Sequence, residues 1–109
     1  MMVEQDAGAA TVTSLDGTAR IVLVGEVGEA TADRLRPDAL ARLQQPLEHL
    51  VVDLRKCSYL EPATVDLLGE LFGLATEQGA AIAVQGASPN VRVILGISGL
   101  LGLADSSGG

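Results

Sequence analysis

The spacing of apolar and polar positions at the start of the chain predicts two strands joined by a tight turn. Residues 10–15 (ATVTSL) alternate weakly between apolar and polar, and residues 19–24 (ARIVLV) are rich in β-branched residues. Asp16-Gly17 lies between them, and this dipeptide is typical of a hairpin turn. We therefore expect an antiparallel pair at the amino-terminal end.

A second pattern, in residues 49–74, predicts a buried strand followed by a long helix. Residues 50–54 (LVVDL) are apolar with one polar interruption, as in a strand that is buried on both faces. Residues 55–58 (RKCS) interrupt this run. Glu61-Pro62 then predicts a helix start, because proline lacks the N–H that would go unpaired there and Glu61 complements the helix dipole. The turn between strand and helix is where α/β proteins usually place functional groups.

The other segments complete an alternating order of strands and helices. They are a loop at Gly25–Gly28 in which Gly28 takes a positive φ, a helix over residues 31–44 capped by Thr31, a strand over residues 80–84 and a helix over residues 89–98. The order β-β-α-β-α-β-α predicts an α/β fold. Right-handed crossovers would give a mixed, mostly parallel sheet with helices packed largely on one side.

Length and charge narrow the class of protein. A chain of 109 residues suits one domain, expected over residues 10–104, with flexible ends at 1–9 and 105–109. Seven basic against 14 acidic residues give a net charge of −7. An acidic surface disfavours nucleic acid and anionic membranes, because both are bound through basic patches. We expect neither partner.

The single cysteine and the lack of long apolar stretches indicate where the protein works. One cysteine forms no intrachain disulfide, which suits a reducing compartment. The amino-terminal residues do not show a signal peptide pattern, and no apolar stretch approaches the roughly 18 residues of a membrane span. We expect a cytoplasmic protein without membrane insertion.

Few residues offer catalytic chemistry. One His and one Cys are too few for a zinc site, and His49 precedes the buried strand without a partner pattern. Asp53 and Glu61 could form an acid/base pair, although strand-end carboxylates more often accept hydrogen bonds from backbone N–H groups. No glycine-rich phosphate loop is present. We expect no enzymatic activity, no cofactor and no metal.

Two groups of apolar residues have no obvious partner in the predicted elements. The first comprises Val93 and Ile97 on the last helix with the apolar residues that follow over 100–103. The second comprises Phe72 with Gly69 and Gly73. Internal packing and a protein interface both explain such groups, and the sequence leaves the two open.

Three segments, in order, resemble the STAS domain, the fold of anti-sigma factor antagonists. LVGEVGEATADRLRPDAL resembles the family's G-E-L-D-x-x-T loop and first helix. HLVVDLRKCSYLEPATVDLL resembles L-x-L-D-L-S-x-V-x-F-L-D-S-S-G-L, and GASPNVRVILGISGL resembles the segment G-x-S/P-x-x-V-x-x-x-L-x-x-x-G-L. The resemblance covers about residues 21–103. It implies a non-catalytic switch protein in which a partner kinase, itself the anti-sigma factor, phosphorylates a serine at the start of the central helix.

The chain departs from this pattern at the switch itself. Glu61, Pro62, Ala63 and Thr64 stand at the D-S-S-G positions, so Pro62 replaces the phosphoserine, and Gly28 replaces the loop aspartate. Thr64, two residues later, is a possible substitute acceptor. The Ser106-Ser107 pair in the tail lacks the flanking strand and helix of the motif.

The resemblance therefore predicts a regulatory binding protein without the usual phosphoswitch. The expected partner is an anti-sigma factor or another GHKL-type kinase-like protein. A homodimer or a STAS paralogue is a further possible partner. The alternative is a STAS subunit of a larger assembly, either a stressosome-like scaffold or the accessory of a lipid-transport ABC system. The predicted partner-binding residues are Gly25, Glu26, Gly28, Glu61, Pro62, Ala63, Thr64 and Val65.

Overall fold

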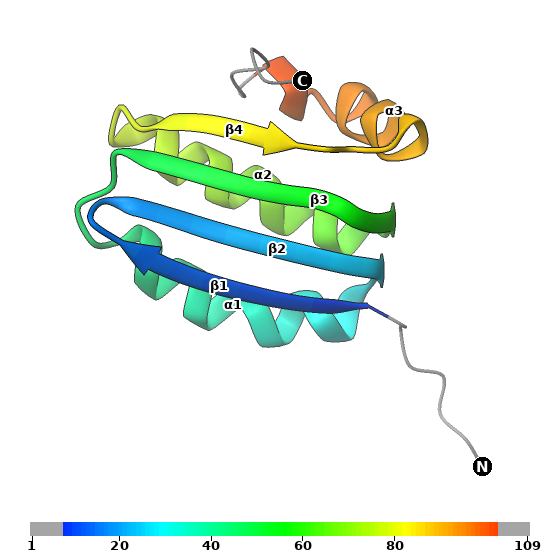
Figure 1. Ribbon diagram of the computed structural model, residues 1–109, viewed down its shortest axis with the longest axis horizontal. Helices are drawn as coiled ribbons and strands as arrows, with labels where there is room; N and C mark the ends of the chain where they lie inside the picture. The colour runs from blue at the N-terminus through cyan, green and yellow to red at the C-terminus, as the bar shows by residue number, and fades with distance from the viewer. Residues whose placement is uncertain (1–7, 103–109) are drawn as a thin grey trace.

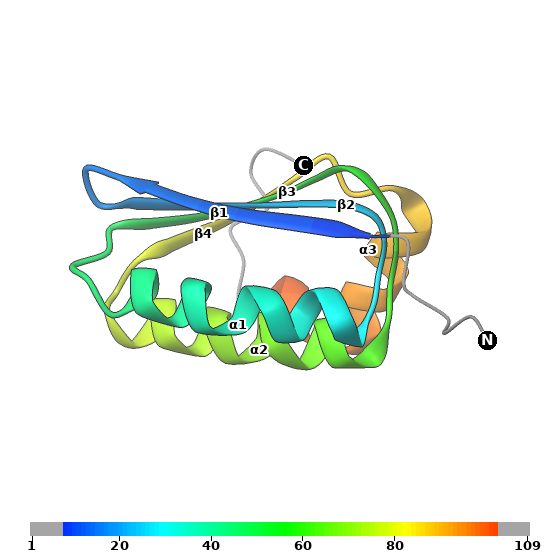
Figure 2. The ribbon, with the colours of Figure 1, turned by 90° about the horizontal axis from the view of Figure 1, so that it is seen from below.

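A computed structural model describes residues 8–102 and shows one mixed sheet with its main helices on one face (Figures 1 and 2). The elements are β1 (Ala9–Leu15), β2 (Thr18–Val27), α1 (Glu29–Leu43), β3 (His49–Leu60), α2 (Pro62–Glu77), β4 (Ala81–Gln85), α3 (Pro89–Ile97) and the 3-10 turn η1 (Leu100–Gly102). The strand order is β1-β2-β3-β4, with β1 antiparallel to β2 and the other pairs parallel. The predicted fold class and element order are confirmed.

The hairpin forms where the sequence predicts it. Asp16 and Gly17 both have a positive φ, 52° and 82°. Two consecutive positive φ values match the twist of the flanking strands, which is why Asp-Gly favours this turn. The register then places Val12 opposite Ile21, and both side chains face the helices within the core.

An aliphatic core lies between the sheet and helices α1 and α2. Alternate residues are buried in the first part of β2 and in β4, as the period of two requires. Phe72 is the one aromatic residue of the core, and it is 1% exposed. The largest fully buried aliphatic residues are Ile21, Leu23, Val27, Leu43, Leu50, Val52, Leu54, Leu60, Leu68, Leu71 and Leu95.

The predicted interruption of the central strand over residues 55–58 is wrong. Strand β3 continues for 12 residues to Leu60 and pairs with β2 as far as Val27. Arg55 and Lys56 are exposed, while Cys57 and Leu60 are buried. The polar residues are tolerated because α1 and α2 cover one face of the sheet and leave the other face open (Figure 2).

The expected loop at Gly25–Gly28 also differs. Residues 25–27 belong to β2, and it is Gly25 that has a positive φ, 79°, next to a shift in the β2–β3 register. Gly28 is the N-cap of α1, with a φ of −116°. Helix α1 therefore starts at Glu29, and Thr31 is not its cap but a buried residue inside the first turn.

The structure shows which of the two apolar groups without an obvious partner is buried. Ser88 caps α3 as predicted, because its Oγ accepts a hydrogen bond from the Val91 N–H at 3.3 Å. Leu100 is buried and packs beside Gly69 of α2. Phe72 is also buried, so the group formed by Phe72, Gly69 and Gly73 serves internal packing. Val93 and Ile97 remain exposed.

The ends of the predicted domain can be compared only in part. Residues 1–7 and 103–109, most of the two ends expected to be flexible, lie outside the described residues. At the amino-terminal end, β1 already begins at Ala9. Within residues 8–102 no helix is both long and apolar enough to cross a membrane.

Candidate functional site

The start of α2 is fixed against the end of β2 by backbone hydrogen bonds. Glu61 is the N-cap, and its N–H donates to the Val27 carbonyl at 3.0 Å. The N–H groups of Thr64 and Val65 donate to the Glu61 carbonyl at 2.9 and 3.1 Å. Pro62 occupies the first helical turn, as predicted. The β3–α2 turn and the end of β2 thus form one rigid corner at the right of Figure 1.

Thr64 belongs to the interior of this corner, and its position argues against a role as substitute phosphate acceptor. Its side chain is buried, and the residue is 1% exposed. The hydroxyl donates to the Val27 carbonyl at 2.8 Å and lies 3.4 Å from the Gly28 carbonyl. A kinase needs a hydroxyl at the surface, and this one ties α2 to the β2–α1 connection.

The structure brings the eight predicted partner-binding residues into one region but divides them by depth. Gly28 and Thr64 are buried. Glu26 and Pro62 are exposed, and Gly25, Glu61, Ala63 and Val65 are half-buried. The accessible surface is therefore the outer side of the α2 start together with the end of β2. Pro62, at the family's acceptor position, has its ring on this surface.

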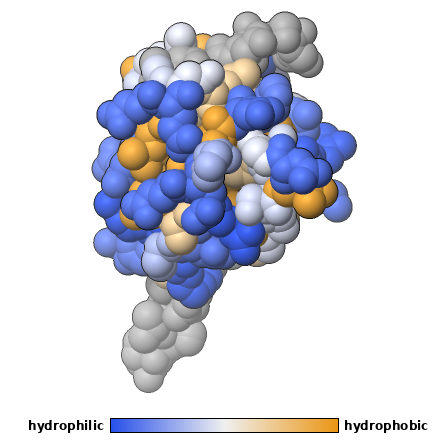
Figure 3. All heavy atoms as spheres, turned by 90° about the vertical axis from the view of Figure 1, so that its left-hand side faces the viewer, coloured by the Kyte–Doolittle hydropathy of each residue, from blue (hydrophilic) through white to orange (hydrophobic). Residues whose placement is uncertain are grey.

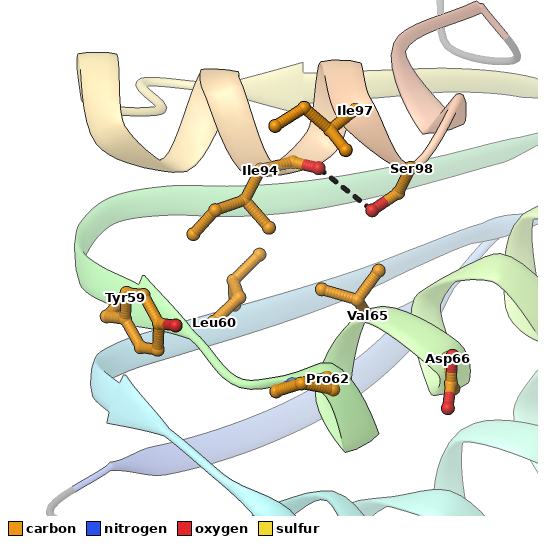
Figure 4. Close-up of a pocket in the computed structure, with 8 residues that line it drawn as sticks. All are labelled: Tyr59, Leu60, Pro62, Val65, Asp66, Ile94, Ile97 and Ser98. Atoms are coloured by element: carbon orange, nitrogen blue, oxygen red, sulfur yellow. Dashed lines mark hydrogen bonds between the residues drawn. The ribbon is translucent and has the colours of Figure 1, made fainter.

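A groove between α2 and α3 extends this surface (Figure 4). Its volume is about 330 Å³, and its lining is mostly apolar: Tyr59, Leu60, Pro62, Val65, Asp66, Ile94, Ile97 and Ser98. Ile97 is 83% exposed and Tyr59 is 46% exposed. Of the lining residues, sequence reasoning predicted only Pro62 and Val65 as site residues, and it missed Tyr59, Leu60, Asp66, Ile94, Ile97 and Ser98. The apolar Ile97 on the outer side of the last helix was the available signal.

The opposite end of the molecule has a smaller hollow, of about 220 Å³, beside the β1–β2 turn, where Leu15 is 75% exposed. Figure 3 shows that hydrophilic residues dominate this end, with apolar atoms scattered among them. His49, at the start of β3, is exposed there. The accessible apolar groove therefore marks the α2–α3 end as the candidate binding surface.

Asp53, one of the two candidate acids, is held in an ion-pair cluster. Its carboxylate accepts hydrogen bonds from the guanidinium of Arg55 at 2.6 and 3.0 Å, from the Arg55 backbone N–H at 3.0 Å and from Arg20 at 2.8 Å. Hydrogen bonds from the Arg55 side chain and backbone are the main reason that the pKa of Asp53 lies well below its usual range. Such a carboxylate stays ionised and is a poor general acid. Glu61 is not among its partners in residues 8–102.

Neither Cys57 nor a metal site adds chemistry to this region. Burial raises the pKa of the Cys57 thiol, which keeps it protonated and weakly nucleophilic. Among residues 8–102 no group of three or more His, Cys, Asp or Glu side chains is placed to hold a metal ion.

The sheet order, the single helical face and the corner at the start of α2 define an α/β module of the SpoIIAA type. The family model described as "Mlab, STAS domain" matches residues 10–105. The chain therefore belongs to the STAS domain family. The comparison with curated proteins finds no match.

Several solved structures share this fold. The phosphorylated form of the Bacillus cell fate determinant SpoIIAA has a TM-score of 0.74 and 17% identity, covering 89% of each chain. An anti-sigma factor antagonist from Mycobacterium paratuberculosis has a TM-score of 0.72 and 22% identity, and the match covers 94% of this chain and 87% of that one. The STAS domain of a SulP transporter from Vibrio cholerae has a TM-score of 0.66 and 19% identity, and the match covers 88% of this chain and 74% of that one. At these identities the likeness establishes the fold.

Proposed function

We propose that this STAS domain is a non-catalytic regulatory binding protein that acts as an anti-sigma factor antagonist. It binds an anti-sigma factor or GHKL-type kinase-like partner and so controls sigma-factor-dependent transcription. The observation that carries the proposal is the surface at the start of α2. There the exposed Pro62 stands at the position of the family's phosphoserine and also lines an apolar groove. Binding is then constitutive, or it is controlled by the partner.

The chemistry of the α2 start supports binding without a phosphoswitch. In a switch of this kind, a phosphate on the helix start adds up to two negative charges at the interface and disrupts an apolar contact. Neither Pro62 nor Ala63 has a hydroxyl, and the Thr64 hydroxyl is buried. The start of α2, residues 61–64, thus offers no exposed hydroxyl to a kinase. The likeness to anti-sigma factor antagonists supports the assignment of partner.

A permanent negative charge at Pro62 should remove partner binding. We expect Pro62→Glu to weaken capture of the partner from native lysate by about tenfold or more, since a carboxylate would be desolvated in an apolar contact. Affinity capture followed by mass spectrometry measures this. Pro62→Ala is the matched control and should retain the partner. Equal retention by wild type and Pro62→Glu would contradict the proposal.

Restoring the hydroxyl should restore the switch if the acceptor is all that is missing. Pro62→Ser places a hydroxyl at an exposed position of the first helical turn. With the partner kinase and ATP, we expect this variant to gain the mass of one phosphate while the wild type gains none, as measured by intact mass spectrometry. An unmodified Pro62→Ser variant would mean that the changes at Ala63 or Gly28 have also removed kinase recognition.

A second candidate function is a STAS subunit of a larger assembly, such as the accessory of a lipid-transport ABC system. The likeness to the STAS domain of a SulP transporter supports a role for this fold as part of a transporter. The same capture experiment separates the candidates. A permease and an ATPase in the eluate would support the transporter accessory, and a sigma-factor regulator would support the first proposal.

A further inference from the structure

We propose that the partner segment bound here is an amphipathic helix with basic flanks, and that it lies in the groove between α2 and α3. This inference rests on the proposed function, because it names the chemistry of the partner at the same site. It adds a second contact region, on α3, to the start of α2. Three features carry it: the spacing of the lining residues, the exposure of the groove, and the acidic residues in its lining or next to it.

The lining residues form a seat for a third helix. On α2 they are Pro62, Val65 and Asp66, and on α3 they are Ile94, Ile97 and Ser98. Both sets follow the spacing i, i+3, i+4, so each helix presents one ridge to the groove. In Figure 4, Val65 of α2 and Ile94 of α3 point into the space between the helices, and the Asp66 carboxylate points away from α3 at the edge of the groove. Helices pack by placing the ridges of one into the grooves of another, which makes a helix the natural occupant.

The exposure of the lining favours a macromolecular segment over a small molecule. A small-molecule pocket typically encloses 70–90% or more of its ligand. Here the side of the groove formed by Ile97 and Tyr59 is open, since these residues are 83% and 46% exposed. A helix that lies across the opening would bury both side chains, whereas an enclosed ligand would leave them in solvent.

Three acidic residues lie in the groove lining or next to it along the chain or the sheet, and none of them forms an ion pair within residues 8–102. Asp66 lies in the lining, Glu61 lies between the lining residues Leu60 and Pro62, and Glu26 is the β2 register partner of Tyr59. The ion pairs within residues 8–102 join other acids to arginine. No basic residue is among the described residues that line the groove. Lysine or arginine beside the apolar stripe of the partner would therefore complement these acidic residues.

Two synthetic peptides test the inference directly. Each is about 16 residues long, enough for four helical turns, with the same leucine stripe and with either lysine or glutamate at the polar positions. The full chain is labelled with ¹⁵N and titrated with each peptide by NMR. We expect the lysine peptide to bind at least about tenfold more tightly than the glutamate peptide, with the largest shifts at Tyr59, Val65 and Ile97.

Two exposed apolar residues of α3 provide a matched pair of variants. Ile97→Ser removes a groove residue and should weaken binding of the lysine peptide about tenfold. Val93 is 59% exposed but lies outside the lining, so Val93→Ser should change the affinity by less than about twofold. Asp66→Asn should reduce the preference for lysine over glutamate. Unchanged amide spectra away from the groove verify that each variant is folded.

The outcomes separate this inference from the proposed function. Absence of binding, equal affinity for the two peptides, or equal losses for Ile97→Ser and Val93→Ser would overturn the inference. A lysate partner that is lost on Pro62→Glu but retained by Ile97→Ser would also overturn it, while leaving the proposed function in place. Binding of the lysine peptide in the groove with capture of no regulatory partner would sustain the groove as a helix site and contradict the proposed function.

Discussion

Thr64→Glu should unfold much of the protein at moderate denaturant, with a loss of about 4 kcal/mol or more in the free energy of unfolding. Thr64 is 1% exposed, and its hydroxyl donates to the Val27 carbonyl at 2.8 Å. Glutamate at this position would bury a larger side chain whose charge faces carbonyl oxygens. Small domains are stable by only about 5–15 kcal/mol, so the change consumes a large fraction of the total. Urea denaturation followed by circular dichroism measures it.

Two matched variants separate the burial of charge from the loss of the hydroxyl. Thr64→Val removes only the side-chain hydrogen bond and should lower the free energy of unfolding by about 1 kcal/mol. The loss is small because the Val27 carbonyl still accepts a hydrogen bond from the Glu61 N–H. Pro62→Glu introduces the same charge at an exposed position of the same turn, where the helix dipole favours it, and should change stability by less than about 1 kcal/mol. A Thr64→Glu variant as stable as Pro62→Glu would contradict the buried position of Thr64. It would also reopen Thr64 as a phosphate acceptor.

Asp53→Asn should lower the free energy of unfolding by about 2 kcal/mol at pH 7. The Asp53 side chain is 7% exposed and accepts charged hydrogen bonds from two arginines. An amide retains one acceptor oxygen but turns an NH₂ group toward these donors. Because the Arg20 and Arg55 side chains are 36% and 65% exposed, water compensates part of the loss. The expected cost is therefore below that of breaking a fully buried pair.

The same variant predicts a pH dependence with a definite sign. Arg55 and Arg20 hold the pKa of Asp53 below its usual range in the folded protein, whereas an aspartate in the unfolded chain has a pKa of about 3.9. The carboxylate therefore contributes its full stability above about pH 5, and the contribution is lost as the pH falls through the folded pKa. We expect the difference between wild type and Asp53→Asn to be smaller at pH 2 than at pH 7. Chemical denaturation at both values measures it.

Asp38→Asn is the control for this prediction. Asp38 pairs with Arg42 across one turn of α1, and its side chain is 56% exposed. Exposed pairs of this kind contribute about 0.3–0.5 kcal/mol, so this variant should differ little from wild type at either pH. A difference for Asp53→Asn that is the same at pH 2 and pH 7 would show that the carboxylate charge is not what stabilises the cluster.

Local patterns in the sequence were sufficient to predict the order of the elements. The periods of two and 3.6 identify strand and helix without reference to distant residues. Asp16-Gly17 and Ser88 act on their immediate backbone neighbours, and both are found as predicted. Pro62 also begins α2 as expected. Element order, the hairpin and two helix starts depend on interactions within a few residues.

The depth of each site residue depended on packing between distant segments. Thr64 points inward because its hydroxyl donates a hydrogen bond to the Val27 carbonyl at the end of β2. These two residues are 37 positions apart in the sequence. Strand β3 continues through Arg55 because the adjacent face of the sheet carries no helix and Arg55 finds Asp53 there. Tyr59 and Ile97 line the same groove only because α3 packs against β3, near the start of α2. Side-chain period names the face of one element, and only the assembled layers decide what that face meets.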